Sequence, residues 1–194
     1  MTPPQNSLHY ASFSTPDGPF SVVANDSHVL ASGWTWDIAS LIELIHPTLR
    51  AADPAPGDQA AVPGQGSVLT HAAEAVADYY AGDTAALDSV PVAQRSGPFR
   101  EQAWEVLRQV APGAPLTYAS YAQRAGRPAA VRAAAGACAM NAAALFVPCH
   151  RVIRTDGGLG GFRYGVQIKE SLLRREAAPA PSPLADPRLE SPAR

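Results

Sequence analysis

Cys149, His150 and Arg151 are consecutive residues that bring a thiol, an imidazole and a guanidinium to one point of the chain. A cysteine acts as a nucleophile only as the thiolate, and an unperturbed pKa of about 8.5 leaves most of it protonated at neutral pH. A nearby imidazole and a nearby guanidinium both favour the anion. The tripeptide therefore predicts a cysteine nucleophile, with Cys149 as the reacting group.

Direct contact between Cys149 and His150 is limited, because consecutive side chains diverge. A bridging water would link the thiol to the imidazole, and an acid such as Glu176 would orient the imidazole. The residues alone leave two other interpretations open: a small buried hydrophobe, which is the common fate of free cysteine, and a metal ligand. The metal site is less well supported, since zinc sites use paired ligand spacing. The other histidines are scattered along the chain: His9, His28, His46 and His71.

The second cysteine, Cys138, has no charged neighbour and falls on a predicted helix, so we expect it to serve packing. The first ten residues, MTPPQNSLHY, have neither the basic nor the apolar region of a secretory signal. No stretch approaches the roughly 20 apolar residues of a membrane span. We therefore expect reduced thiols and a cytoplasmic protein without a membrane partner.

Charge is distributed unevenly along the chain. Residues 1–97 carry two arginines against ten acidic residues, a net charge of −8, whereas residues 98–178 carry eleven basic residues against five acidic ones, a net charge of +6. An acidic half followed by a basic half predicts an anionic partner, such as nucleic acid, for the second half only. The alternative is that the positive charge of the second half belongs to a solvated surface without a binding role.

The first half predicts a small antiparallel sheet followed by helices. Three runs rich in valine, aromatic and serine residues are separated by turn signals and read as strands: 8–14, 20–25 and 28–36. Asp37 can cap a helix of apolar residues at helical spacing. A second helix is expected over 68–80, ended by Gly82, and the Ala-, Pro- and Gly-rich stretch 51–66 predicts a loop.

The second half predicts a chain of short helices. An amphipathic helix should run from Phe99 to Ala111, and Thr117 should cap a helix that ends at Ala125. A third helix, 129–140, follows after a tight break, which is typical of a helix-turn-helix, although many helical proteins contain such a pair. The last segments are expected to be a glycine-rich loop (157–161), a final helix, and a disordered tail (179–194).

In this order the segments resemble the O6-alkylguanine-DNA alkyltransferase family, over about residues 97–178. The matching segments are GPFREQAWEVL, LTYASYA, GRPAAVRAAAGACAMN, VPCHRVI, GGLGGFRYG and KESLLRREA. The resemblance implies an α+β fold. A small sheet-plus-helix domain of ribonuclease-H-like type (residues 1–92) would precede a mostly helical, winged helix-turn-helix-like alkyltransferase domain (residues 93–178).

The resemblance implies a single-turnover methylated-DNA–protein-cysteine methyltransferase that needs no cofactor. Cys149 would accept the alkyl group from O6-alkylguanine in double-stranded DNA, and from O4-alkylthymine, as a stable thioether. His150 would act as the water-linked base and Glu176 as its orienting carboxylate. Asn141 would brace the turn that holds the cysteine.

The resemblance also assigns residues to DNA and to the base. Tyr118 would help rotate the target nucleotide and donate a hydrogen bond to guanine, and Arg132 would fill the space that the flipped nucleotide leaves. The small side chains of Ala130 and Ala133 suit close approach to the minor groove. Arg151 is also expected to contact DNA. Six residues are expected to line the substrate pocket: Val147, Pro148, Gly160, Gly161, Phe162 and Arg163.

The sequence departs from the family pattern at three positions. The common Asn-Pro pair is here Asn141-Ala142, which predicts a less rigid turn; Phe162 replaces the usual tyrosine; and Ala119 stands where glycine often follows the tyrosine. Three rival functions remain: a non-catalytic alkyltransferase-like lesion-binding protein, a helix-turn-helix transcription regulator, and a Cys-His hydrolase. Self-association on DNA is also left open.

Overall fold

The computed structural model describes residues 8–50 and 67–177, a mixed α/β chain with two small sheets and six α-helices within those ranges. The predicted loop 51–66 and the predicted tail 179–194 lie outside the described residues. Within the described ranges, no helix combines the length and the apolar character that crossing a bilayer requires.

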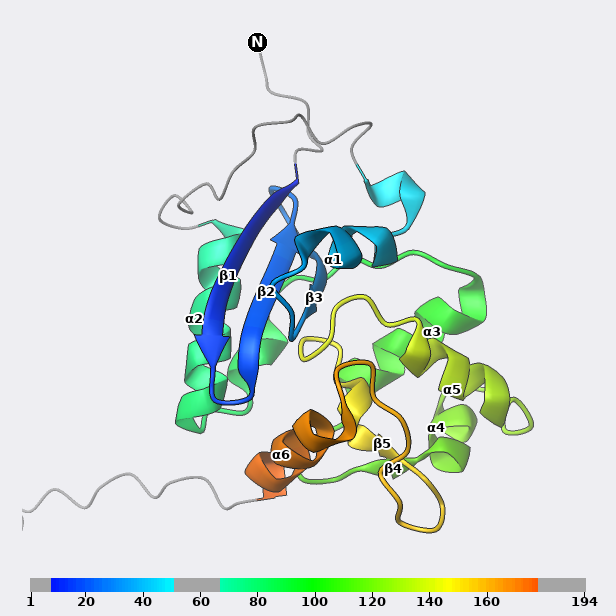
Figure 1. Ribbon diagram of the computed structural model, residues 1–194. Helices are drawn as coiled ribbons and strands as arrows, with labels where there is room; N and C mark the ends of the chain where they lie inside the picture. Colours follow the sequence, from blue (N-terminus) through cyan, green and yellow to red (C-terminus); the bar gives the residue numbers. More distant parts are fainter. Residues whose placement is uncertain (1–7, 51–66, 178–194) are drawn as a thin grey trace, which may run out of the picture.

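The first half is a three-stranded antiparallel sheet with a helix on each face (Figure 1). Its strands follow in chain order: β1 (His9–Thr15), β2 (Gly18–Ala24) and β3 (Val29–Gly33). Alternate residues of β2 enter two separate apolar clusters, because side chains of a strand point to opposite faces. Phe20, Val22 and Ala24 share one cluster with helix α2, and Val23 shares the other with helix α1.

The first helix begins where the sequence predicts, and the second has its predicted start and ends one residue later than predicted. Helix α1 (Ile38–Leu44) is capped by Asp37, whose carboxylate accepts from Ser40 N at 3.2 Å. Helix α2 (Val68–Ala81) ends at Gly82, whose φ of 113° is in the left-handed region that glycine favours. Two short 3₁₀ helices follow the α-helices, η1 (Pro47–Leu49) and η2 (Ala86–Ser89).

Three helices open the second half: α3 (Pro98–Arg108), α4 (Tyr118–Arg124) and α5 (Val131–Ala139). Thr117 caps α4 as expected, its hydroxyl accepting from Ser120 N at 3.1 Å. Two buried hydrogen bonds attach α3 to its neighbours. Trp104 Nε1 donates to Ala137 O on α5 at 2.9 Å, and Tyr121 Oη donates to Ala103 O at 2.8 Å. The adjacent α4–α5 pair agrees with the predicted helix pair.

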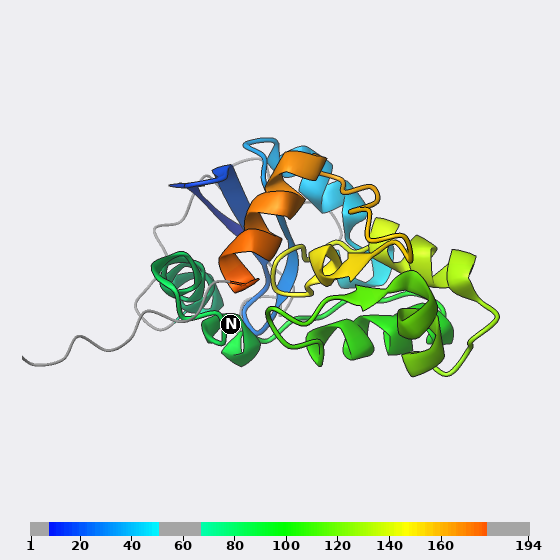
Figure 2. The ribbon, with the colours of Figure 1, turned by 90° about the horizontal axis from the view of Figure 1, so that it is seen from below.

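The remaining elements surround Cys149. The short helix η3 (Cys149–Arg151) leads directly into β5 (Val152–Ile153), which pairs in parallel with β4 (Leu116–Thr117). Helix α6 (Val166–Ala177) packs beside η3 (Figure 2). Neither two-residue strand is predicted from the sequence, because pairs this short have no periodicity to detect.

The free edge of β3 joins the two halves. Val29 N donates to Pro91 O at 2.8 Å, and Ser32 N donates to Ala142 O at 2.9 Å. The buried Ser32 hydroxyl adds a bond to Ala144 O at 2.8 Å. The edge of the N-terminal sheet thus holds the segment that leads to Cys149.

Candidate active site

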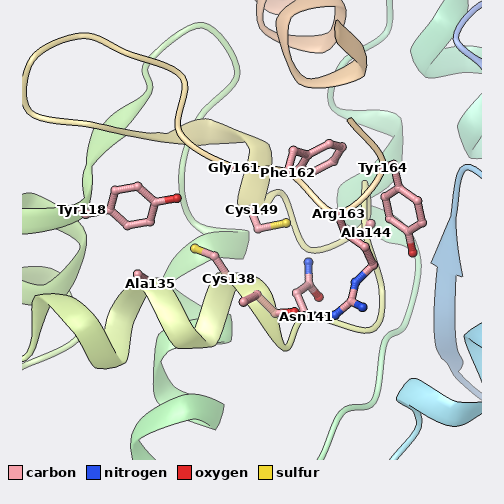
Figure 3. Close-up of a pocket in the computed structure, with 11 residues that line it drawn as sticks. Tyr118, Ala135, Cys138, Asn141, Ala144, Cys149, Gly161, Phe162, Arg163 and Tyr164 are labelled. Carbon is pink, nitrogen blue, oxygen red and sulfur yellow. Dashed lines mark hydrogen bonds between the residues drawn. The ribbon is translucent and has the colours of Figure 1, made fainter. Parts of the chain in front are cut away.

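Cys149 opens on a cavity of about 410 Å³ and is itself 8% exposed (Figure 3). The cavity is lined by side chains from α4, α5, the turn before the cysteine, and the loop after β5. The hydroxyl of Tyr118 and the amide of Asn141 both point toward Cys149 from opposite sides. The residues around the cysteine are Tyr118, Ala135, Cys138, Ala139, Asn141, Ala144, Gly161, Phe162, Arg163 and Tyr164.

A buried ion cluster lies behind the cysteine. His150 Nε2 donates to Glu176 Oε1 at 2.9 Å, and both side chains are fully buried. Arg151 binds the same carboxylate through Nε and Nη2, each at 2.9 Å, and donates through Nη1 to Val110 O at 2.5 Å. His150 Nδ1 has no hydrogen-bond partner within the described ranges, so it is available to accept a proton.

The charges of this cluster fix its protonation. Burial raises the pKa of Glu176, but the hydrogen bonds and charges of His150 and Arg151 outweigh burial and lower that pKa to about 2. Burial lowers the pKa of His150, and the neighbouring Glu176 only partly opposes this. At neutral pH the cluster therefore holds a neutral imidazole against a carboxylate and a guanidinium.

The position of Arg151 corrects two expectations. Its side chain is 3% exposed and faces Glu176, so it neither reaches a DNA surface nor acts on the Cys149 thiol. Burial instead raises the pKa of Cys149, opposed by a hydrogen bond from Asn141 and by the charges of Lys169 and Arg163. The cysteine at rest is thus a neutral thiol that needs a base, rather than the preformed thiolate that the tripeptide predicts.

Lys169 is a site residue that sequence reasoning missed. Its side chain is fully buried and its ammonium donates to Val152 O at 2.6 Å. Burial lowers the pKa of Lys169, and the ionised forms of Cys149 and Cys138 oppose this. A signal was present, because Lys169, Leu172 and Glu176 lie three and four residues apart on α6 and share one face of the helix. The one lysine of the sequence on an apolar helix face indicates a buried role.

Asn141 lies at the turn before Cys149. Its Nδ2 donates to Val147 O at 2.7 Å, and its Oδ1 accepts from Ala143 N at 3.2 Å. Leu145 in the same turn has a φ of 75°, a conformation that a side chain with a β-carbon rarely adopts. Hydrogen bonds across the turn therefore hold a strained backbone.

The loop over the cavity is held by aromatic contacts that the sequence does not reveal. Phe162, Tyr164 and Trp34, which follows the end of β3, pack against one another. The ring centroids of Phe162 and Tyr164 lie 5.8 and 5.6 Å from the indole and 5.8 Å from each other. Tyr164 Oη donates to Ser32 O at 3.2 Å, and Arg163 donates to Ala139 O. Trp34 and Tyr164 were not predicted as site residues, since their partners lie more than 100 residues away in the sequence.

The other predicted residues divide into three groups. Gly161, Phe162 and Arg163 line the cavity as expected. Val147 and Pro148 are buried and Gly160 lies against Tyr118, and none of the three is among the described residues that line it. Arg132 and Ala133 are exposed in the first turn of α5 and Ala130 is half-buried at its start. Cys138, expected to serve packing, lines the cavity.

Comparison with known proteins finds a family match in the second half of the chain. Residues 98–178 match the family model of the 6-O-methylguanine DNA methyltransferase, DNA binding domain. The chain is 40% identical over 141 residues to the "Bifunctional transcriptional activator/DNA repair enzyme Ada" of Escherichia coli, which covers 73% of this chain and 37% of that protein. It is 29% identical over 177 residues to the "Methylated-DNA--protein-cysteine methyltransferase" of Mycobacterium bovis, covering 91% and 97%.

A solved structure agrees with these relatives. The crystal structure of Mycobacterium tuberculosis OGT in complex with DNA superimposes with a TM-score of 0.67 at 27% identity, over 90% of this chain and 96% of that one. The second half is thus a DNA-binding domain of the 6-O-methylguanine DNA methyltransferase class. The chain belongs to the O6-alkylguanine-DNA alkyltransferase family. It spans 25% to 59% of the length of the first curated relatives it matches.

Proposed function

We propose that this protein repairs alkylated DNA by transferring the alkyl group from guanine O6 to Cys149, once and irreversibly. The observation that carries the proposal is the place of Cys149, which opens on a cavity of about 410 Å³ and is followed in the chain by His150, whose buried imidazole is paired with Glu176. A cavity of this size suits a flat aromatic base, and a nucleophile beside an oriented base suits group transfer.

The chemistry begins from a neutral thiol. His150 takes the thiol proton through a bridging water, and Glu176 stabilises the imidazolium that forms. The Cys149 sulfur attacks the alkyl carbon in line, a carbon–sulfur bond forms, and the electron pair of the breaking carbon–oxygen bond passes to guanine. Tyr118 donates a hydrogen bond to the ring as the charge develops, and the proton that guanine takes up balances the one the thiol released.

The product explains why each molecule acts once. A thioether is stable in water, so the acceptor is not regenerated and the protein is consumed as a reagent. The acceptor and the base both belong to the chain, and the proposed reaction uses no cofactor. The same in-line attack serves O4-alkylthymine, whose alkylated oxygen presents an equivalent carbon.

We propose that α5 enters the minor groove and that the target nucleotide rotates into the cavity. Exposed Arg132 and Ala133 lie on the outer side of α5, whereas Ala135 and Cys138 of the same helix line the cavity. One helix therefore faces both DNA and the reacting base. The small alanine side chains allow close approach of the backbone, and Arg132 fills the vacated position in the base stack.

The finer fold description belongs to the same proposal. We infer a ribonuclease-H-like domain over residues 1–92 and a winged helix-turn-helix-like domain over residues 93–178. The three-stranded sheet with its flanking helices and the α4–α5 pair support it. DNA containing alkylated guanine is the partner we propose, in the cytoplasm and at the nucleoid.

The deciding experiment is the intact mass of the protein after incubation with duplex DNA that contains O6-methylguanine. We expect one added methyl group per chain, mapped to the peptide that contains Cys149, and no addition to Cys149→Ser. Methylation of Cys138 in that variant would move the acceptor and contradict the assignment. Tight binding to the lesion without any mass change would favour a lesion-binding protein instead.

A further inference from the structure

The Asn141-Ala142 turn has a partner that compensates for its missing proline. Alanine retains the backbone N–H that proline lacks, and Ala142 N donates it to Gln94 Oε1 at 2.8 Å. Gln94 Nε2 in turn donates to Asn141 Oδ1 at 3.0 Å. Gln94 therefore holds both residues of the turn with one side-chain amide.

The Gln94 side chain comes from a segment that is itself fixed. The neighbouring Ala93 N donates to Val29 O at 2.9 Å, so residues 92–94 run along the edge of β3. On the same strand edge, Ser32 N donates to Ala142 O at 2.9 Å. Gln94 and the turn are thus attached to one strand, and the distance between them is set by the sheet.

The direction of the Ala142 N–H determines how two amides are oriented. Because a backbone N–H only donates, the Gln94 oxygen must face Ala142 and the Gln94 nitrogen must face Asn141. Asn141 must then present its oxygen to Gln94, where that oxygen also accepts from Ala143 N at 3.2 Å. Its nitrogen is left to face Val147 O, at 2.7 Å, and the sulfur of Cys149.

We propose that Gln94 is a positioning residue for alkyl transfer, which orients the Asn141 amide toward Cys149 and replaces the rigidity of a proline at position 142. This inference rests on the proposed function of Cys149. Leu145 in the same turn has a strained backbone, at a φ of 75°, and the hydrogen bonds of Gln94 help to hold the turn in this conformation. A proline at position 142 would remove the N–H and with it the hydrogen bond that sets the direction of the Gln94 amide.

The test uses Gln94→Leu, Ala142→Pro and the double variant in the full-length protein. The matched control is Gln102→Leu, since Gln102 is an exposed glutamine on α3. Two quantities are measured: the rate of methyl transfer from O6-methylguanine duplex DNA, and the pH profile of Cys149 alkylation by iodoacetamide, followed by peptide mass. Gln94→Leu should slow transfer about five- to tenfold, the effect of one or two hydrogen bonds, and move the alkylation profile to higher pH.

The double variant distinguishes positioning from general stability. The loss in transfer rate caused by Gln94→Leu should be at least threefold smaller in the Ala142→Pro background than in the wild-type background. In that background the hydrogen bond from residue 142 to Gln94 is already absent. Equal losses in both backgrounds, or an unchanged alkylation profile, would overturn the proposal. If the wild-type protein transfers no methyl group but Gln94→Leu still shifts the alkylation profile, the bracing of Asn141 stands and the proposed function fails.

Gln94→Glu keeps the inference testable if Gln94→Leu does not fold. Its carboxylate still accepts from Ala142 N, so the fold should be retained, but it cannot donate to Asn141 and attracts the Asn141 nitrogen instead. The Asn141 amide should then turn away from Cys149. We expect the alkylation profile to shift upward at nearly unchanged thermal stability, and a wild-type profile in this variant would contradict the proposal.

Discussion

Tyr79 Oη on α2 donates a hydrogen bond to Glu176 Oε1 on α6 at 3.1 Å, across 97 positions of sequence. The same oxygen accepts from His150 Nε2 and from Arg151 Nη2, so this carboxylate is held from both halves of the chain. Tyr79 is fully buried, and burial together with Glu176 raises the pKa of Tyr79. The hydroxyl therefore stays protonated and always donates.

Tyr79→Phe should weaken this support without leaving a large cavity. Loss of one buried hydrogen bond to a charged group should lower the free energy of unfolding by about 1.5–3 kcal/mol. Alkyl transfer should slow about threefold or more, because the imidazole of His150 loses part of its orienting carboxylate. Chemical denaturation and single-turnover kinetics measure the two effects. Tyr10→Phe, at a half-buried position of β1, should change neither, and an equal effect there would remove the special role of Tyr79.

The buried Glu176 predicts a loss of stability in acid. The pKa of this carboxyl is lowered from its ordinary value of 4.5 to about 2 by His150 and Arg151, against the effect of burial. A carboxyl with a lower pKa in the folded chain stabilises the fold above its unfolded pKa and loses that contribution as the pH falls toward 2. The contribution lost is about 3 kcal/mol, at 1.4 kcal/mol per pKa unit.

Urea denaturation of the wild type and Glu176→Gln between pH 7 and pH 3 measures this contribution. Glu176→Gln should be less stable at pH 7, because Arg151 then stays buried without its counter-charge. The difference should narrow below pH 4.5 as the wild-type carboxyl loses its advantage. A difference that is constant over this range would mean that Glu176 is not the group that titrates.

The contact between Gly33 and Tyr164 predicts a second dependence of the site on the N-terminal sheet. A β-carbon on Gly33 would lie 2.0 Å from the Tyr164 ring, so Gly33→Ala must push away the loop that carries Phe162 over the cavity. We expect alkyl transfer to slow and stability to fall by about 1–3 kcal/mol. Gly97→Ala is the control, since nothing lies within 4 Å of a β-carbon there.

A double-mutant cycle identifies Tyr164 as the group displaced. In a Tyr164→Ala background the added methyl group has room, so Gly33→Ala should then cost little in stability or rate. Each variant is measured by thermal unfolding and by single-turnover transfer. Additive effects of the two substitutions would show that Gly33 acts through something other than the ring.

The helix ends could be predicted because their signals are local. Asp37, Thr117 and Gly82 mark helix ends through their own side chains or backbone, and each does so in the structure. The partners of Cys149 are a different case. Adjacency in the chain suggested that Arg151 would act on the thiol, but its guanidinium, like the imidazole of His150, binds the carboxylate of Glu176 on α6.

The rest of the site could not be predicted because it depends on contacts between distant segments. Ser32 binds Ala144 across 112 positions and Gln94 binds Asn141 across 47. A single sequence contains no periodicity that reports such pairs. The replacement of proline by Ala142 was visible, but the hydrogen bond that its N–H makes was not, so the turn was expected to be less rigid than its bonds indicate.

Arg132 provides the prediction that separates DNA handling from chemistry. The side chain is exposed in the first turn of α5, apart from the described residues that line the cavity, so it should contribute nothing to reaction with a free base. Extruding a nucleotide from duplex DNA costs a few kcal/mol, part of which the intercalated arginine should offset. Arg132→Ala should therefore slow transfer from O6-methylguanine duplex DNA about tenfold or more, and leave the reaction with free O6-benzylguanine within twofold of wild type. Arg174→Ala removes an exposed charge on α6, paired with Glu170 at 3.0 Å, and should alter neither rate. Equal losses on both substrates would mean that Arg132 supports the fold of the site, and nucleotide extrusion would then need another residue.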